Sequence, residues 1–133
     1  MKKRVDIVVL GILSILVGLA ACSQPTPEEL ASLAAKGYYD HLIHGEYESF
    51  LEGMDLPEAP EYRSQLLDNY RQFMATQQSS RGGIREVRIV RAKTDSIQKQ
   101  PYTNVFLTLC FGDSTNEEIV VPMVERGGRW RMR

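Results

Sequence analysis

The sequence has 133 residues, of which 43% are hydrophobic and 25% charged, with 16 lysines and arginines against 17 aspartates and glutamates. This length and composition fit one globular domain, and they exclude a multidomain enzyme, a collagen-like repeat and a wholly disordered chain. The formal net charge of -1 provides no cationic field for nonspecific nucleic-acid binding, so we expect no nucleic-acid partner.

The first 21 residues have the pattern of an export signal. Lys2, Lys3 and Arg4 precede an uncharged apolar stretch, residues 7–21, that ends in small residues. A basic start, a short apolar segment and a small-residue exit are typical of a secretory signal peptide. A transmembrane anchor needs about 20 apolar residues, and this stretch is shorter and contains two glycines and a serine. We therefore predict a signal peptide at residues 1–21.

The end of this segment, Leu19-Ala20-Ala21-Cys22, resembles the lipobox of bacterial lipoproteins. The resemblance implies cleavage between Ala21 and Cys22, diacylglycerylation of the Cys22 thiol and acylation of the new N-terminus, with palmitate as the typical acyl group. Two or three acyl chains hold a protein stably on a membrane, whereas one holds it only marginally. The alternative is a plain cleaved signal with a free cysteine.

A lipoprotein signal places the protein in the cell envelope of a Gram-negative bacterium, anchored to a membrane by lipid. Ser23 and Gln24 provide no retention aspartate, which favours the outer membrane over the inner one by analogy with other bacterial lipoproteins. The mature chain keeps 13 basic and 16 acidic side chains, a net charge of -3, because residues 1–21 contain three basic residues and one acidic residue. Residues 22–27 contain two prolines and no apolar periodicity, so we expect a tether there and a domain at residues 28–133.

Helices are expected in the first half of this domain. Thr26 followed by Pro27 and Glu28 is a good helix start. Apolar side chains then recur at helical spacing to about His44, where Gly45 ends or bends the helix. This stripe consists of Leu30, Leu33, Ala34, Gly37, Tyr38, His41 and Leu42. Residues 46–54 continue the helical spacing with Tyr47, Phe50, Leu51 and Met54.

A second helix is predicted from Glu61 to about Gln78, after two prolines and before the Gly82-Gly83 pair. Its apolar set lies on one face and consists of Tyr62, Leu66, Tyr70, Phe73 and Met74.

Four strands are predicted after Gly83, over residues 84–94, 102–111, 118–125 and 129–133. Gly127-Gly128 predicts a two-residue hairpin loop that pairs Arg126 with Arg129, Glu125 with Trp130, Val124 with Arg131 and Met123 with Met132. Because side chains alternate between the two faces, we expect Val121, Met123, Trp130 and Met132 in the core. The opposite, outer face would carry Val120, Pro122, Val124, Arg129, Arg131 and Arg133.

Helices followed by an antiparallel meander define an α+β fold. Two segments, LIHGEYESFLEGM at 42–54 and VFLTLCFGDSTNEEIVVPMVERGGRWRM at 105–132, resemble the nuclear transport factor 2-like (NTF2-like, cystatin-like) superfamily. The resemblance is closest to a family of small Bacteroidetes lipoproteins of unknown function. It implies N-terminal helices packed on a curved four-stranded antiparallel sheet, with a cone-shaped cavity between helix and sheet.

An isomerase of this superfamily would need a carboxylate base inside the cone. The aspartates of the mature chain fall in turns, breaks or beside the helix stripes, and they are Asp40, Asp55, Asp68, Asp95 and Asp113. We therefore expect no catalytic residue and no enzyme activity, with a small isomerase or hydrolase as the alternative.

Other reactive side chains favour packing over chemistry. His41 and His44 are one helical turn apart but have no third ligand, so we expect no metal, a partly buried His41 and an exposed His44. Cys110, between Leu109 and Phe111, is expected to be a small buried hydrophobe. The side chains best suited to line a cavity are Tyr38, His41, Tyr70 and Trp130, with Trp130 expected chiefly as a core residue.

One segment is rich in basic side chains, namely Arg81, Arg85, Arg88, Arg91 and Lys93. A solvated strand face explains it, and an anionic partner such as a polysaccharide or a phosphate headgroup is the alternative. The sequence as a whole predicts a lipid-anchored envelope protein with a non-catalytic binding or interaction domain. Its partners would be the membrane, and a small hydrophobic ligand or an envelope protein, without a cofactor.

Overall fold

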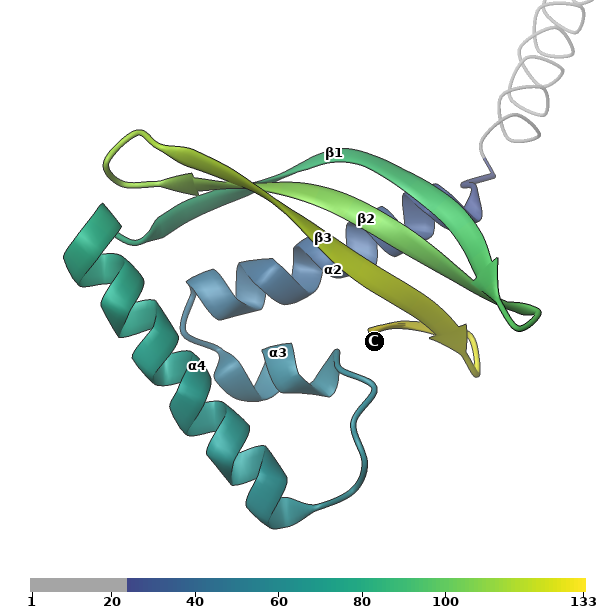
Figure 1. The fold of residues 1–133 in the computed structure, drawn as a ribbon, viewed down its shortest axis with the longest axis horizontal. Coiled ribbons are helices and arrows are strands. Elements are labelled where there is room, and N and C mark those ends of the chain that lie inside the picture. Colours follow the sequence, from purple (N-terminus) through teal and green to yellow (C-terminus); the bar gives the residue numbers. More distant parts are fainter. Residues whose placement is uncertain (1–23) are drawn as a thin grey trace, which may run out of the picture.

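The computed structural model describes residues 24–133, so Cys22 and the predicted signal peptide lie outside the described residues. Three helices come first: α2 (Pro27–Ile43), α3 (Tyr47–Glu52) and α4 (Pro60–Arg81). Four strands follow: β1 (Ile84–Ile97), β2 (Gln100–Phe111), β3 (Asn116–Arg126) and β4 (Arg129–Met132). They form one antiparallel sheet in the order β1-β2-β3-β4, and α2 lies across one face of its curve (Figure 1). The predicted α+β fold is confirmed.

The start of α2 agrees with the sequence prediction. The Thr26 side-chain oxygen accepts a hydrogen bond of 3.2 Å from the Glu29 backbone N–H, and Pro27 is the first helical residue. The helix ends at Ile43, and the His44 N–H caps it by donating to the Asp40 carbonyl. None of the helices between residues 24 and 133 is both long and apolar enough to cross a bilayer.

The buried face of α2 differs from the predicted stripe. Leu30 and Leu33 are 42% and 63% exposed, whereas Ala31 and Ala35 are fully buried. Small side chains let the helix approach the sheet closely, because the strands themselves supply the bulky residues that fill the core. The apolar pattern therefore predicted the helix correctly, but part of the face that it predicted to be buried is exposed.

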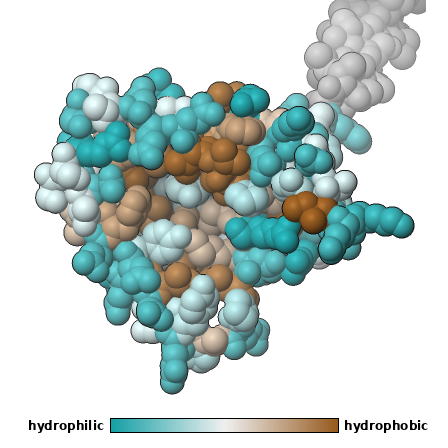
Figure 2. Space-filling view, in the orientation of Figure 1, coloured by the Kyte–Doolittle hydropathy of each residue, from teal (hydrophilic) through white to brown (hydrophobic). Residues whose placement is uncertain are grey.

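Helix α4 is longer than predicted and less buried. No residue of α4 is fully buried, and Tyr62 and Phe73 of the predicted inner face are 45% and 42% exposed. The helix packs on α3 and on β1, and Leu66, Leu67, Tyr70 and Met74 are partly buried against the core. Apolar surface therefore stays visible between α4 and the sheet (Figure 2).

The β3–β4 hairpin has the predicted register, with the four pairs from Arg126–Arg129 to Met123–Met132. Val121, Met123 and Met132 are buried as expected, and Trp130 is half-buried. The prediction was wrong for Val124, which is only 9% exposed although it faces away from α2. Its register partner on that face, Arg131, is itself half-buried.

Strand β1 departs from simple alternation. Its pairing with β2 shifts between Ile84 and Glu86 and again between Ile89 and Arg91, as in a β-bulge. Ile89 is 38% exposed at this irregularity. The strand also runs to Ile97, beyond the predicted end at Thr94.

The inward side chains of β2 form the centre of the core. They are Thr103, Val105, Leu107, Leu109 and Phe111, all 5% exposed or less. Cys110 points to the other face, opposite Glu86 and Asn116, and is half-buried, so the prediction of a buried cysteine was wrong. Strand alternation is the cause, because the two flanking residues already occupy the inner face.

Candidate functional site

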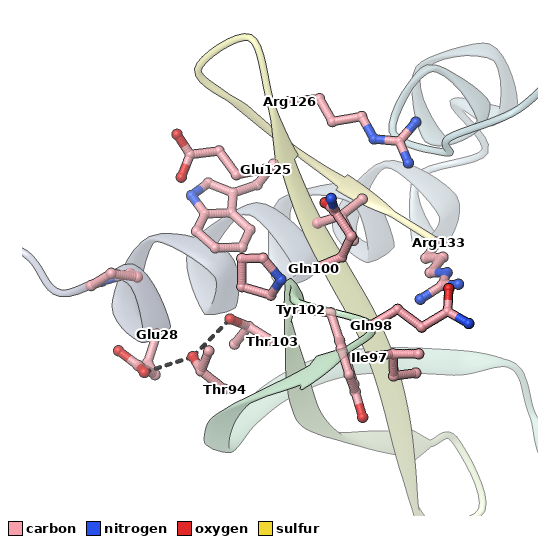
Figure 3. A pocket seen from close by; sticks show the side chains of 14 residues that line it. Glu28, Thr94, Ile97, Gln98, Gln100, Tyr102, Thr103, Glu125, Arg126 and Arg133 are labelled. Atoms are coloured by element: carbon pink, nitrogen blue, oxygen red, sulfur yellow. Dashed lines mark hydrogen bonds between the residues drawn. The ribbon is translucent and has the colours of Figure 1, made fainter.

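A pocket of about 520 Å³ opens where the first turn of α2 meets the tips of the β1–β2 and β3–β4 hairpins (Figure 3). Helix α2 and all four strands contribute to it, so the tertiary fold creates the site. Its lining consists of Pro27, Glu28, Thr94, Ile97, Gln98, Gln100, Pro101, Tyr102, Thr103, Val124, Glu125, Arg126, Trp130 and Arg133.

The pairing register divides this lining between the two faces of the sheet. Thr94 lies opposite Thr103, and Glu125 lies opposite Trp130, on the face that packs against α2. We call the group Glu28, Thr94, Thr103, Glu125 and Trp130 the helix-side wall. In Figure 3 the labelled Glu28 and Glu125 lie on one side of β3, and Ile97, Gln98 and Arg133 lie on the other.

A chain of hydrogen bonds orients the Glu28 carboxylate. The Thr94 hydroxyl donates to Glu28 Oε1 at 2.7 Å, and the two threonine oxygens of Thr94 and Thr103 are 2.9 Å apart. Since the Thr94 proton is directed to Glu28, Thr103 is the donor to Thr94. This arrangement satisfies the Thr103 hydroxyl, although Thr103 is only 1% exposed.

The same hydrogen bond favours the ionised form of Glu28. Donation from Thr94, together with a backbone hydrogen bond, lowers the pKa of Glu28 below its ordinary value. No described basic side chain lies within ion-pair distance of Glu28 or Glu125. The helix-side wall therefore presents two carboxylates that no neighbouring cation neutralises.

Trp130 is held in place through its backbone. The Tyr38 hydroxyl donates to the Trp130 carbonyl at 2.6 Å, which ties β4 to the middle of α2. Two residues further along the same edge of β4, the Met132 N–H donates to the Gly53 carbonyl at 2.6 Å and the Asp55 N–H to the Met132 carbonyl at 2.7 Å. The free edge of the short strand is thus fixed at two positions, and the indole has a defined position in the wall.

The arginines of the lining differ in their surroundings. Arg126 forms an ion pair of 2.9 Å with Asp55, whose side chain is 24% exposed. Arg133 is exposed, and its backbone N–H donates to the Pro122 carbonyl. The polar groups of the pocket are therefore acidic on the helix side and basic beyond β3.

Of the four side chains expected to line a cavity, only Trp130 lines this pocket. Tyr38 lies behind it. Tyr70 packs edge-on against Phe50, with ring centroids 4.9 Å apart, in the contact between α3 and α4. His41 is exposed over 43% of its side chain and lies 3.1 Å from Glu46. Neither His41 nor Tyr70 therefore lines this pocket at the start of α2.

The sequence reasoning missed most of the helix-side wall. Glu28 had been identified only as a helix-start residue, and neither threonine was considered. One signal could have found Thr103: it continues the inward alternation of Val105, Leu107 and Leu109, which places a hydroxyl in an otherwise apolar row. A polar residue in such a position requires a partner.

Three of the basic side chains singled out in the sequence contact neighbouring acidic or aromatic side chains. Arg81 forms an ion pair of 2.8 Å with Glu117 and lies 3.5 Å above the Phe111 ring, and Arg88 pairs with Glu86 at 3.1 Å. Arg91 lies over Phe106 at 4.1 Å. Within residues 24–133, no three His, Cys, Asp or Glu side chains come together as a metal site would need.

No protein-family model matches the sequence, and no curated protein sequence matches it at a significant level. Among solved structures, the fold is similar to that of a Campylobacter jejuni protein to which an NTF2-like transpeptidase function has been ascribed. The TM-score is 0.54 at 19% identity, and the match covers 74% of this chain and 92% of that one. A SEC-C motif-containing protein from Rhodopseudomonas palustris matches with a TM-score of 0.48 at 15% identity, over 77% of this chain and 76% of that one.

The likeness to the Campylobacter jejuni protein supports an NTF2-like fold, as the resemblance of the sequence implied. It concerns the fold alone, since fold does not determine function.

Proposed function

We propose that this protein is a lipid-anchored protein of the bacterial envelope whose NTF2-like domain binds a small ligand without transforming it. The pocket of about 520 Å³ at the start of α2 is the observation that carries the binding role. Its size lies within the range of small-molecule sites. The lipobox-like Leu19-Ala20-Ala21-Cys22 sequence carries the anchoring role.

The chemistry of the pocket favours binding over catalysis. A general base that works near neutral pH needs a raised pKa, and hydrogen bonding lowers the pKa of Glu28 instead. The Thr94 hydroxyl, which could in principle serve as a nucleophile, is therefore next to a weak base. The arrangement is better suited to hold a ligand by fixed charges and hydroxyl groups.

Group transfer is the second candidate function. The function ascribed to the Campylobacter jejuni protein of similar fold suggests it, and the Thr94–Glu28 pair is the observation that would serve it. In that case Thr94→Val would abolish turnover of an envelope peptide substrate. Under the binding proposal, the parent protein shows no turnover to lose.

The anchoring role is tested by comparing the two cysteines. Cys22→Ser should abolish incorporation of a labelled fatty acid and leave the uncut precursor in the membrane, because the thiol is the acylation site. Cys110→Ser is the matched control, and it should be labelled and processed like the parent. Normal labelling of Cys22→Ser would overturn the anchoring proposal.

The binding role is tested by native mass spectrometry of the protein isolated from its own envelope. We expect a co-purifying small molecule, and this molecule should be lost from a variant whose pocket is blocked by a bulky side chain. Thr103→Trp is unsuitable for this purpose because Thr103 is buried. Pro101→Trp, at an exposed lining position, is the better choice. A protein that carries no ligand and binds none from a metabolite extract would overturn this role.

A further inference from the structure

We infer that the helix-side wall of the pocket binds an organic ammonium group, and that the pocket meets this group at the membrane surface. The inference rests on the proposed function, because it names the class of ligand that the same pocket takes. A zwitterionic phospholipid headgroup and a free amine both carry such an ammonium group, and the chemistry that recognises both is the same.

The charges of the wall favour a cation. Glu28 and Glu125 both line the pocket, and no described basic side chain neutralises either one. The N-terminus of α2 contributes about half a positive charge near Glu28, which is less than the two negative charges of the carboxylates. The net field at the wall is therefore negative, although Arg126 and Arg133 stand beyond β3.

The indole makes the wall selective for an organic cation over a simple metal ion. Trp130 lines the pocket directly opposite Glu125 in the β3–β4 register, so an aromatic surface and a carboxylate belong to neighbouring positions of one face. A tryptophan face attracts an ammonium through its quadrupole, and its apolar surface contacts the attached carbons. A metal ion would instead need three or more close ligands, and no such group exists among residues 24–133.

The hydroxyl groups complete the recognition. Thr103 and Thr94 orient Glu28 through their hydrogen bonds of 2.9 and 2.7 Å, so the carboxylate is positioned before a ligand arrives. Such preorganisation reduces the entropy lost on binding.

The position of the pocket relative to the predicted anchor points to the membrane surface. Pro27, the first residue of α2, lines the pocket, and five residues from Cys22 to Thr26 precede it. Five residues span at most about 18 Å when fully extended. With Cys22 lipidated, this wall of the pocket therefore lies within about 18 Å of the bilayer surface. In Figure 1 the N-terminus of α2 and the β1–β2 hairpin occupy the same end of the domain.

The site contains its own reporter, because Trp130 is the only tryptophan of the sequence. Full-length protein in a maltoside detergent is titrated with choline and followed by tryptophan fluorescence. We expect a saturable change. The uncharged isostere 3,3-dimethyl-1-butanol has the same shape, and it should bind at least fivefold more weakly. Equal responses to the two compounds would overturn the inference.

Matched variants locate the binding. Glu28→Gln and Glu125→Gln should each weaken choline binding about threefold, and the double variant about tenfold, because each removes one charge from the wall. Glu118→Gln is the control, since it removes an equal charge from an exposed residue of β3 whose partner Thr108 lies on the opposite face of the sheet. Its choline affinity should be unchanged. Equal effects of all three substitutions would show nonspecific charge attraction and overturn the site.

The source of the ammonium is determined in nanodiscs. A shift in Trp130 fluorescence between discs of phosphatidylethanolamine with phosphatidylglycerol and discs of phosphatidylglycerol alone, lost in the Glu28→Gln/Glu125→Gln variant, supports the headgroup as ligand. Choline binding without any dependence on disc composition supports a free amine. Absence of binding to choline, ethanolamine and both discs would overturn the ammonium site. In that case, a different ligand found in the pocket by native mass spectrometry would still support the proposed binding role. If the parent protein binds choline but incorporates no labelled fatty acid at Cys22, only the anchoring proposal is overturned.

Discussion

The contact between Gly53 and Tyr38 gives the sharpest stability prediction. Gly53 is buried and has an ordinary φ of -76°, so an alanine would be acceptable to the backbone. The obstacle is space, because a Cβ at this position would lie within 2.6 Å of three ring atoms of Tyr38. Neither residue can move away easily, because the Tyr38 hydroxyl donates a hydrogen bond to the Trp130 carbonyl and the Gly53 carbonyl accepts one from the Met132 N–H.

We therefore expect Gly53→Ala to be strongly destabilising. Overpacking of a tight core costs about 1–3 kcal/mol, and displacement of the Tyr38 ring would also cost about 0.5–1.5 kcal/mol by breaking its hydrogen bond to Trp130. The free energy of unfolding should fall by about 2–4 kcal/mol, a large part of the 5–15 kcal/mol typical of a small domain. Urea unfolding followed by Trp130 fluorescence measures the change.

Gly37→Ala is the matched control for this prediction. Gly37 lies inside α2, and nothing within 4 Å would meet its Cβ. Alanine is a better helix former than glycine by about 1 kcal/mol, so this variant should be more stable than the parent. The reasoning is refuted when Gly53→Ala unfolds within about 0.5 kcal/mol of the parent, or when both substitutions shift stability in the same direction.

Three further predictions concern other parts of the molecule. Lys99, at the β1–β2 turn, has a φ of 65°, so Lys99→Gly should raise the urea midpoint by up to the equivalent of about 1 kcal/mol; a lower midpoint would contradict this. Thr94→Val should return the pKa of Glu28 towards its ordinary value of 4.5, as measured by an NMR titration. The ionised Glu28 stabilises the fold above that pH and this stabilisation is lost on acidification, so the variant should lose less stability than the parent when the pH is lowered. Burial raises the pKa of Tyr39 to about 12, so stability should fall as the pH rises from about 10 to 12, and Tyr39→Phe should remove this part of the alkaline loss in urea titrations.

The sequence was sufficient for the fold class and for the local elements with strong signals. The Thr26–Pro27 helix start and the Gly127–Gly128 hairpin are encoded by neighbouring residues, and both are confirmed. The inner face of α2 was not predictable from apolar spacing, because Leu33 and Ala35 are both apolar and either could have faced the sheet. Which of them is buried depends on the size of the side chains that the opposing strands contribute. The irregularity of β1 near Ile89 likewise has no clear local signal.

The candidate site was harder to predict than the fold. Glu28, Thr94, Thr103 and Glu125 are unremarkable in sequence and become neighbours of a pocket only through the pairing of three strands and the helix start. Trp130 was identified because it is a single large aromatic residue in a hairpin of known register. His41 and Tyr70 do not line this pocket, because helical spacing predicts which face a side chain shares but not which element that face contacts.

The uneven attachment of α4 has a consequence for how the domain opens. Its C-terminal end is held by backbone hydrogen bonds from Asp113 to Arg81 and from Gly112 to Gly83. The middle of the helix packs Leu66, Leu67 and Tyr70 against the core, whereas its first turns are held by the exposed ion pair between Arg63 and Glu48. Surface ion pairs contribute little, so the first turns of α4 should exchange their amide hydrogens well before the strands do. The sheet and α2 then form a rigid unit, from which α4 unfolds locally, starting at its N-terminal end. A protease would cleave first at residues 56–60, and the pocket would stay intact because it lies on the rigid unit.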